Sequence, residues 1–188
     1  MTTNSELFGT ANARLTEIVE GVEDWTASSP CTGWTVRDVL DHLIDTERDF
    51  LGQHELDAGP RPDTAQEPAD GWRTHSSRVQ AILDTPELAE TQFDGFFGPT
   101  TVGATLARFY GFDLVVHRWD IARGAGVDSR FTDSELDLIE QSLEGFGEHL
   151  YMEGICRPAL PAPADASRET RLLARMGRDA QWRPSVNA

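Results

Sequence analysis

The segment 102–123 constrains the fold most, because it is apolar around most of a helical circumference. Its large apolar side chains fall on several sides of the helix: Phe109, Phe112, Leu114, Val115, Val116, Trp119 and Ile121. A helix that is apolar all round is buried, so we predict that this segment is the central helix of the fold. Asp113, His117 and Asp120 interrupt it as one stripe roughly 60° wide, at about 100° per residue. Ionisable groups on a buried helix need partners or a metal ion.

Helical periodicity elsewhere in the chain predicts further helices around this one. The segments with apolar residues at helical spacing are 5–22, 36–52, 68–83, 133–150 and a short C-terminal helix that ends at Gly177. In the first segment the stripe is Leu7, Ala11, Leu15, Ile18 and Val19. Thr35 and Thr132 are good N-caps, and Glu135 completes a capping box with Thr132. We therefore expect an all-α fold.

The connections are also distinguishable by composition. Residues 53–67 are polar and proline-containing, which predicts a surface loop. Residues 90–103 alternate briefly in polarity and are punctuated by glycine and proline, which suits a small hairpin or an irregular crossing. We expect a helical bundle over residues 1–155, with a linker and a short helix over 156–188 packed on it.

Composition and charge exclude several classes of protein. A chain of 188 residues, 39% of them hydrophobic, can bury one domain core. The formal charge of −16 repels phosphate backbones and anionic lipid, so we expect neither nucleic-acid nor membrane binding. No run is long enough to span a membrane and the first residues do not resemble a signal peptide, so a cytoplasmic protein is expected.

The two cysteines do not form a disulfide framework or a thiolate zinc site. Cys31 and Cys156 lie far apart and make no CxxC pair. Each is expected to be a reduced cysteine. Cys31 precedes a predicted helix, where the helix dipole could lower its pKa and make the thiol reactive.

Three residues are candidate metal ligands. Asp113 and His117 stand at i and i+4, which places their side chains on one helix face about 6 Å apart along the axis. Helical metal sites use this spacing, although ordinary Asp-to-His hydrogen bonds use it as well. His42 lies at the edge of the apolar stripe of its helix. It could equally be a half-buried histidine bonded to Asp38 or Asp45.

Three longer phrases carry a family resemblance. PCTGWTVRDVLDHL, FYGFDLVVHRWDIARG and the C-terminal RLLARMGRDAQW resemble the actinobacterial branch of the DinB-like superfamily, which contains the metal-binding domain of mycothiol-dependent maleylpyruvate isomerase. The resemblance implies an up-and-down four-helix bundle with short extra helical segments. It also implies one divalent ion, zinc first and nickel second, held by His42, Asp113 and His117. The family's middle ligand is typically glutamate, so the shorter Asp113 leaves a metal-free bundle open.

The implied function is a metal-dependent transferase or isomerase that uses a low-molecular-weight thiol, mycothiol, on a small electrophile. Three protein ligands leave an open coordination position, as catalytic sites do. The isomerase relative carries an additional C-terminal domain, so maleylpyruvate isomerisation itself is not expected. The alternative is a non-catalytic metal- or small-molecule-binding stress-response module. A homodimer is a further expectation.

Other residues receive weaker assignments. Arg37 and Trp34 lie in the matching phrases and are expected to contact the cofactor, although Arg37 could simply pair with Asp38 or Asp41. Asp120 could orient a ligand histidine through a hydrogen bond.

The remaining histidines and Trp119 have simpler expected places. We expect His54 to be solvated and His75 and His149 to lie on the surface. Trp119, on an apolar helix, is expected in the core.

Overall fold

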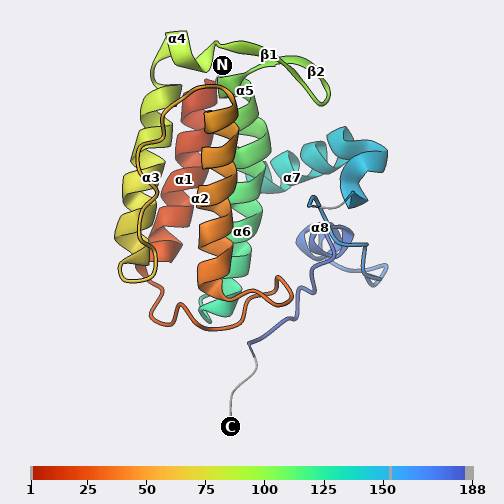
Figure 1. Cartoon of the computed structure of the whole chain (residues 1–188). Helices are drawn as coiled ribbons and strands as arrows, with labels where there is room; N and C mark the ends of the chain where they lie inside the picture. Colours follow the sequence, from red (N-terminus) through yellow and green to blue (C-terminus); the bar gives the residue numbers. More distant parts are fainter. Residues whose placement is uncertain (1, 153, 185–188) are drawn as a thin grey trace.

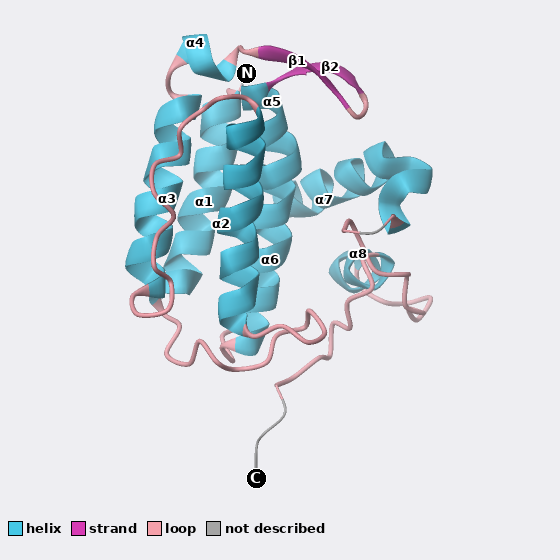
Figure 2. Cartoon of the chain, in the orientation of Figure 1, coloured by secondary structure: helices cyan, strands magenta, loops and turns pink. Residues whose placement is uncertain are grey.

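The computed structural model describes residues 2–152 and 154–184 and shows a bundle of long helices with a small hairpin and a C-terminal helical extension (Figures 1 and 2). The bundle consists of α1 (Asn4–Glu20), α2 (Val36–Gln53), α3 (Pro68–Leu83) and α6 (Gly111–Gly124). α1 packs against α3 and α6, and α2 packs against the same two helices. The predicted all-α bundle is confirmed. In the described residues no helix is long and apolar enough to cross a membrane.

The connection between α2 and α3 departs from the expected alternation of helix directions. Residues 54–67 run back along α2, since Arg61 Nε lies 2.6 Å from Asp45 Oδ1 and Thr64 Oγ1 donates to Asp41 Oδ1 at 2.5 Å. α3 therefore begins at the same end of the bundle as α2 and runs parallel to it (Figure 1). A strictly up-and-down order is wrong for this pair, because the long loop returns the chain before α3 starts.

The central helix is interrupted by one wide turn. α5 (Val102–Thr105) leads through a π-helical turn, Leu106–Tyr110, into α6. The predicted burial of this central helix is confirmed, and Trp119 is fully buried. π-helical turns often occur at functional sites, and this one ends directly before the turn that carries Asp113.

Local sequence signals set the helix boundaries well. Thr35 and Thr132 form the predicted caps, each with a complete capping box, and α3 has the predicted limits. The predicted apolar stripe of α1 is confirmed except at its first member: Ala11, Leu15 and Val19 are buried and Ile18 is partly buried against the core. Leu7 is 46% exposed, and Phe8 takes its place in the core. This buried face of α1 packs against both α3 and α6.

The predicted hairpin is present. After α4 (Pro86–Ala89), β1 (Gln92–Gly95) pairs antiparallel with β2 (Gly98–Thr101). The hairpin extends from one end of the bundle over the side where α7 lies (Figure 2). Its turn residue Phe97 reaches Phe146 of α7, with 6.1 Å between the ring centroids.

The C-terminal part lies beside the bundle. α7 (Asp133–Phe146) ends four residues earlier than predicted, because Gly147 adopts a positive φ of 53° and a 3₁₀ turn follows. α8 (Arg168–Arg175) packs on α7 and ends before Gly177, which has φ 73° as a helix-ending glycine. The division at residue 155 stays a prediction.

Candidate metal centre

The packing of α2 against α6 brings His42, Asp113 and His117 together. One donor atom from each residue lies within 4.8 Å of the donor atoms of the other two. His42 Nε2 lies 3.8 Å from Asp113 Oδ2, and the two imidazole centroids are 5.0 Å apart. The residues that the sequence singled out as ligands are therefore neighbours in space.

The three side chains sit at the edge of the core. The side chains of His42 and Asp113 are 26% and 21% exposed, and that of His117 is 10% exposed. The group is shielded from bulk water yet reachable by a small molecule. Partial burial strengthens electrostatic interactions with a cation without closing the site.

A buried carboxylate controls which nitrogen of His117 faces the group. His117 Nδ1 lies 2.9 Å from Asp120 Oδ2, and Asp120 is fully buried. Arg178 donates to the same carboxylate from Nε and Nη2, at 2.9 and 2.7 Å. Burial alone would raise the pKa of Asp120, but the Arg178 charge and the hydrogen bonds from His117 and Arg178 outweigh it and hold the pKa below its ordinary value.

Because Asp120 remains an anion, it accepts the hydrogen bond and His117 Nδ1 carries the proton. The Nε2 lone pair of His117 is then free to bind a cation. Carboxylate-oriented histidines are the usual ligands of zinc and similar ions in proteins. The orienting role that the sequence suggested for Asp120 matches this geometry.

A second cluster shares His117 but suits a metal less well. Cys31 Sγ lies 3.4 Å from Asp120 Oδ2, and Cys31, His117 and Asp120 form a compact group. Arg178 already occupies the Asp120 carboxylate, and its positive charge would repel a metal cation. Burial, followed by the Asp120 charge, raises the pKa of the Cys31 thiol, which fits the expected plain reduced cysteine and not a thiol activated by the helix dipole.

The first group has the right donors for a divalent ion. Two imidazoles and one carboxylate suit zinc, nickel, iron or manganese. Asp113 has no arginine partner in the described part of the chain, so its charge remains available. His42, Asp113 and His117 thus fit the metal better than the cysteine cluster does.

A cavity of about 600 Å³ opens directly onto His42 and His117. Its walls come from the segment around Cys31, from Tyr151 and Cys156 after α7, and from Arg178 after α8. The C-terminal extension therefore forms one side of the space beside the candidate metal centre.

Trp34 lies at this cavity, and Arg37 does not. The Trp34 ring stands 5.1 Å from the His42 ring, is 37% exposed and lines the cavity. Arg37 is half-buried and absent from the cavity wall, and its Nε has no hydrogen-bond partner in the part of the chain that the structure describes. The expected carboxylates pair elsewhere, since Asp41 binds Arg61 and Asp38 caps α2. Cofactor contact by either residue stays a prediction.

The other histidines lie outside the group. His54 is the C-cap of α2, half-buried, with its ring 4.1 Å from that of Phe93. The surface position expected for His75 is wrong: it is fully buried and its Nε2 lies 2.8 Å from Glu47 Oε2. His149 is partly exposed, in the 3₁₀ turn after α7.

Sequence reasoning missed one partner of the site and one buried acid outside it. Arg178 lies in the C-terminal phrase but carries no local signal that it reaches Asp120, 58 positions away. The buried Glu47 was also missed, because it is a charged residue on the apolar stripe of α2. The position of this glutamate among the apolar residues of α2 was the one sequence signal that it would be buried.

Comparison with known proteins agrees with the geometry. The family model of the mycothiol maleylpyruvate isomerase N-terminal domain matches residues 8–122. This chain belongs to that family. The matched region contains His42, Asp113, His117 and Asp120, and ends before Arg178. The family domain binds a metal in the isomerase, and this chain carries a candidate His/Asp/Cys metal-binding group. No curated protein and no solved structure matches the chain.

Proposed function

We propose that this protein is a divalent-metal-dependent enzyme that transfers a low-molecular-weight thiol to a small electrophile, or isomerises the electrophile through the thiol. Mycothiol is the first candidate for the thiol, because the description of the family names it. The observation that carries the proposal is the group of His42, Asp113 and His117, open to a cavity on one side and oriented by Asp120 on the other.

In this proposal the three side chains hold the ion, with zinc first and nickel second. When bound, a divalent cation supplies Lewis acidity that lowers the pKa of a thiol beside it. Three protein ligands leave room for such a thiol. Asp120 keeps the proton on His117 Nδ1, so that Nε2 remains a neutral donor.

The cavity beside His42 and His117 offers the space for the thiol. Trp34 presents its partly exposed ring at one wall, and Arg157 and Tyr151 supply polar groups at another. The Trp34 face can pack on an apolar portion of the thiol compound, and the polar groups can hydrogen-bond to the remainder. Arg178 is bound to Asp120 and contributes mainly to the wall.

The test is thiol transfer by protein whose metal content is controlled. Chelator-treated protein is reloaded with zinc or nickel, and the loss of free thiol is followed with 1-chloro-2,4-dinitrobenzene and, in turn, mycothiol, glutathione or cysteine. We expect turnover that requires the metal and prefers mycothiol. The His42→Ala variant should lose it, whereas His149→Ala, outside the group, should keep it.

Two results would contradict the proposal. Turnover that is equal with and without metal would remove the ion from the chemistry. Metal binding without turnover of any thiol, across a panel of aromatic and aliphatic electrophiles, would favour the alternative of a non-catalytic binding module.

A further inference from the structure

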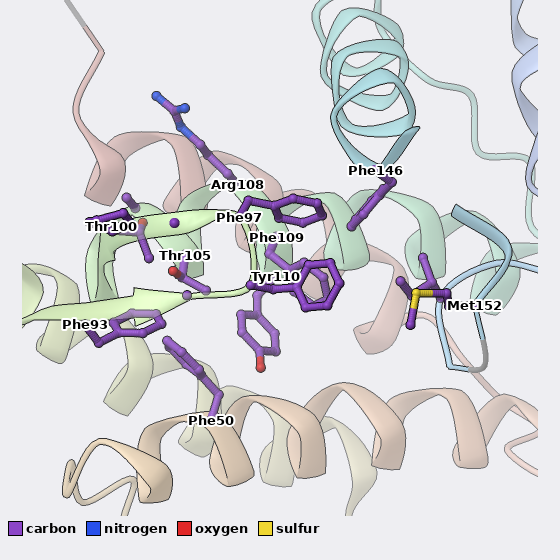
Figure 3. Close-up of a pocket in the computed structure, with 16 residues that line it drawn as sticks. Phe50, Phe93, Phe97, Thr100, Thr105, Arg108, Phe109, Tyr110, Phe146 and Met152 are labelled. Carbon is purple, nitrogen blue, oxygen red and sulfur yellow. The ribbon is translucent and has the colours of Figure 1, made fainter. Parts of the chain in front are cut away.

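A second cavity, of about 610 Å³, lies under the hairpin and is lined mainly by aromatic rings (Figure 3). The rings come from α2, β1, the hairpin turn, the π-helical turn and α7: Phe50, Phe93, Phe97, Phe109, Tyr110 and Phe146. Small-molecule sites commonly have volumes of about 300–1,000 Å³ and apolar walls. This cavity has the size and lining of a ligand site.

The hairpin turn carries two phenylalanines that neither the turn geometry nor the core requires. Phe96 and Phe97 occupy the two turn positions between β1 and β2 and are 69% and 62% exposed. Turns of this kind favour glycine, asparagine and aspartate, and exposed phenylalanines contribute little to the core. Instead, Phe96 reaches His149 with 5.0 Å between ring centroids, and Phe97 reaches Phe146. The turn thus forms a roof between the bundle and α7.

The charge of the lining indicates a neutral ligand. Among the residues that the structure describes, Arg108 is the one charged residue in the cavity wall; it is exposed and points away from the rings (Figure 3). A net charge of −16 also disfavours anions. Offset and edge-to-face contacts with several phenyl rings favour a planar aromatic molecule.

The cavity neighbours the one beside the candidate metal centre. Met152 and Ile155 line both this cavity and the one beside His42 and His117. Tyr110 lies in the aromatic wall, one helical turn before Asp113. A molecule in the aromatic cavity therefore contacts residues that also border the cavity beside the metal-binding group.

We infer that the aromatic cavity binds the uncharged, planar aromatic body of the electrophile on which the protein acts. This inference names the substrate class of the proposed function and rests on it in that respect. Binding itself needs no turnover, so it can be measured separately.

The test uses the neutral fluorescent probe N-phenyl-1-naphthylamine with chelator-treated and zinc-loaded protein. We expect saturable binding of one probe per chain. The Phe97→Ala and Phe109→Ala variants, both at partly exposed positions, should weaken it about tenfold. Leu7→Ala removes an apolar side chain on α1 whose exposure lies between those of Phe109 and Phe97, and it should leave probe binding unchanged. Naphthalene should displace the probe, and maleate should not.

Three outcomes would overturn the inference. These are the absence of saturable binding, equal affinity in all variants, and a dimer that Phe97→Ala converts into a monomer. The last result would mean that a second copy covers the cavity. Probe binding as expected without thiol transfer would retain the cavity and reject the proposed function. Metal-dependent transfer whose rate does not change in Phe97→Ala, and which shows no preference for aromatic electrophiles, would retain the proposed function and reject the role of the cavity.

Discussion

His117 Nδ1 and Asp120 Oδ2 lie 2.9 Å apart inside the central helix, and this contact determines which imidazole nitrogen faces His42 and Asp113. The carboxylate is held in turn by Arg178, from beyond the last helix. The candidate metal centre therefore depends on a chain of contacts that extends from α2 to the C-terminal segment.

Replacing Asp120 by asparagine should weaken metal binding about 10- to 100-fold, because His117 would lose the anion that fixes its proton on Nδ1. The change also leaves Arg178 buried without its partner, which typically costs about 3–5 kcal/mol of stability. A chelating-dye competition measures the affinity, and urea unfolding measures the stability.

The double variant Asp120→Asn/Arg178→Met separates these two effects. It removes the unpaired charge, so part of the stability should return while the metal affinity stays low. Full recovery of affinity in the double variant would show that Asp120 acts only through folding.

The helix boundaries could be predicted because their causes are local. Thr35 caps α2 and proline begins α3, each within a few residues of the helix that it starts. The Asp113–His117 spacing is equally local. His42 joined them only through the resemblance, because no periodicity relates α2 to α6.

Long-range partners could not be predicted. His75 stands among polar neighbours, which suggested a surface position, but α3 packs against both α1 and α2 and turns that face inward. The Asp120–Arg178 pair depends on how the C-terminal segment folds back, which no local pattern records.

The buried Glu47–His75 pair should give a measurable pH dependence of stability. Burial raises the pKa of Glu47 above its ordinary 4.5, although the hydrogen bond and charge of His75 oppose this. The folded protein thus keeps the proton to a higher pH than the unfolded chain does. The free energy of unfolding therefore falls as the pH rises above 4.5 through the folded pKa.

Glu47→Gln should remove that contribution, so the variant should gain stability relative to the wild type between pH 4.5 and neutrality. Urea unfolding with chelator present measures this difference. Glu148→Gln, at a 90% exposed side chain, serves as the control. Identical pH slopes for the wild-type and Glu47→Gln proteins would contradict the assignment.

The close approach of α6 to the loop before α2 predicts a packing defect. A Cβ at Gly124 would clash with Val36 Cγ2 and would lie 2.8 Å from the Ser28 carbonyl oxygen. Gly124→Ala should therefore cost about 1–3 kcal/mol, measured by thermal or urea unfolding. Gly52→Ala, on α2 with no atom within 4 Å, should be neutral or stabilising. Equal stability of the two variants would show that the loop before α2 can move to accommodate the added methyl group.

The cysteines should be unreactive in the folded protein. Burial raises the pKa of both the Cys31 and Cys156 thiols, and thiol reactivity follows the thiolate fraction. With chelator present at neutral pH, 5,5′-dithiobis(2-nitrobenzoate) should modify the folded protein much more slowly than the urea-unfolded chain. The Cys156→Ser variant reports on Cys31 alone, and rapid labelling of that variant would restore the idea of an activated thiol.

The most direct measurement is the metal content of tag-free protein, determined by elemental analysis after zinc or nickel is offered and excess ion is removed. We expect close to one ion per chain in the wild type and in a His54→Ala/His149→Ala control, and almost none in His42→Ala/His117→Ala. A wild-type protein that retains no metal, or a His42→Ala/His117→Ala variant that retains as much as the wild type, would contradict the assignment of His42, Asp113 and His117 as a metal centre.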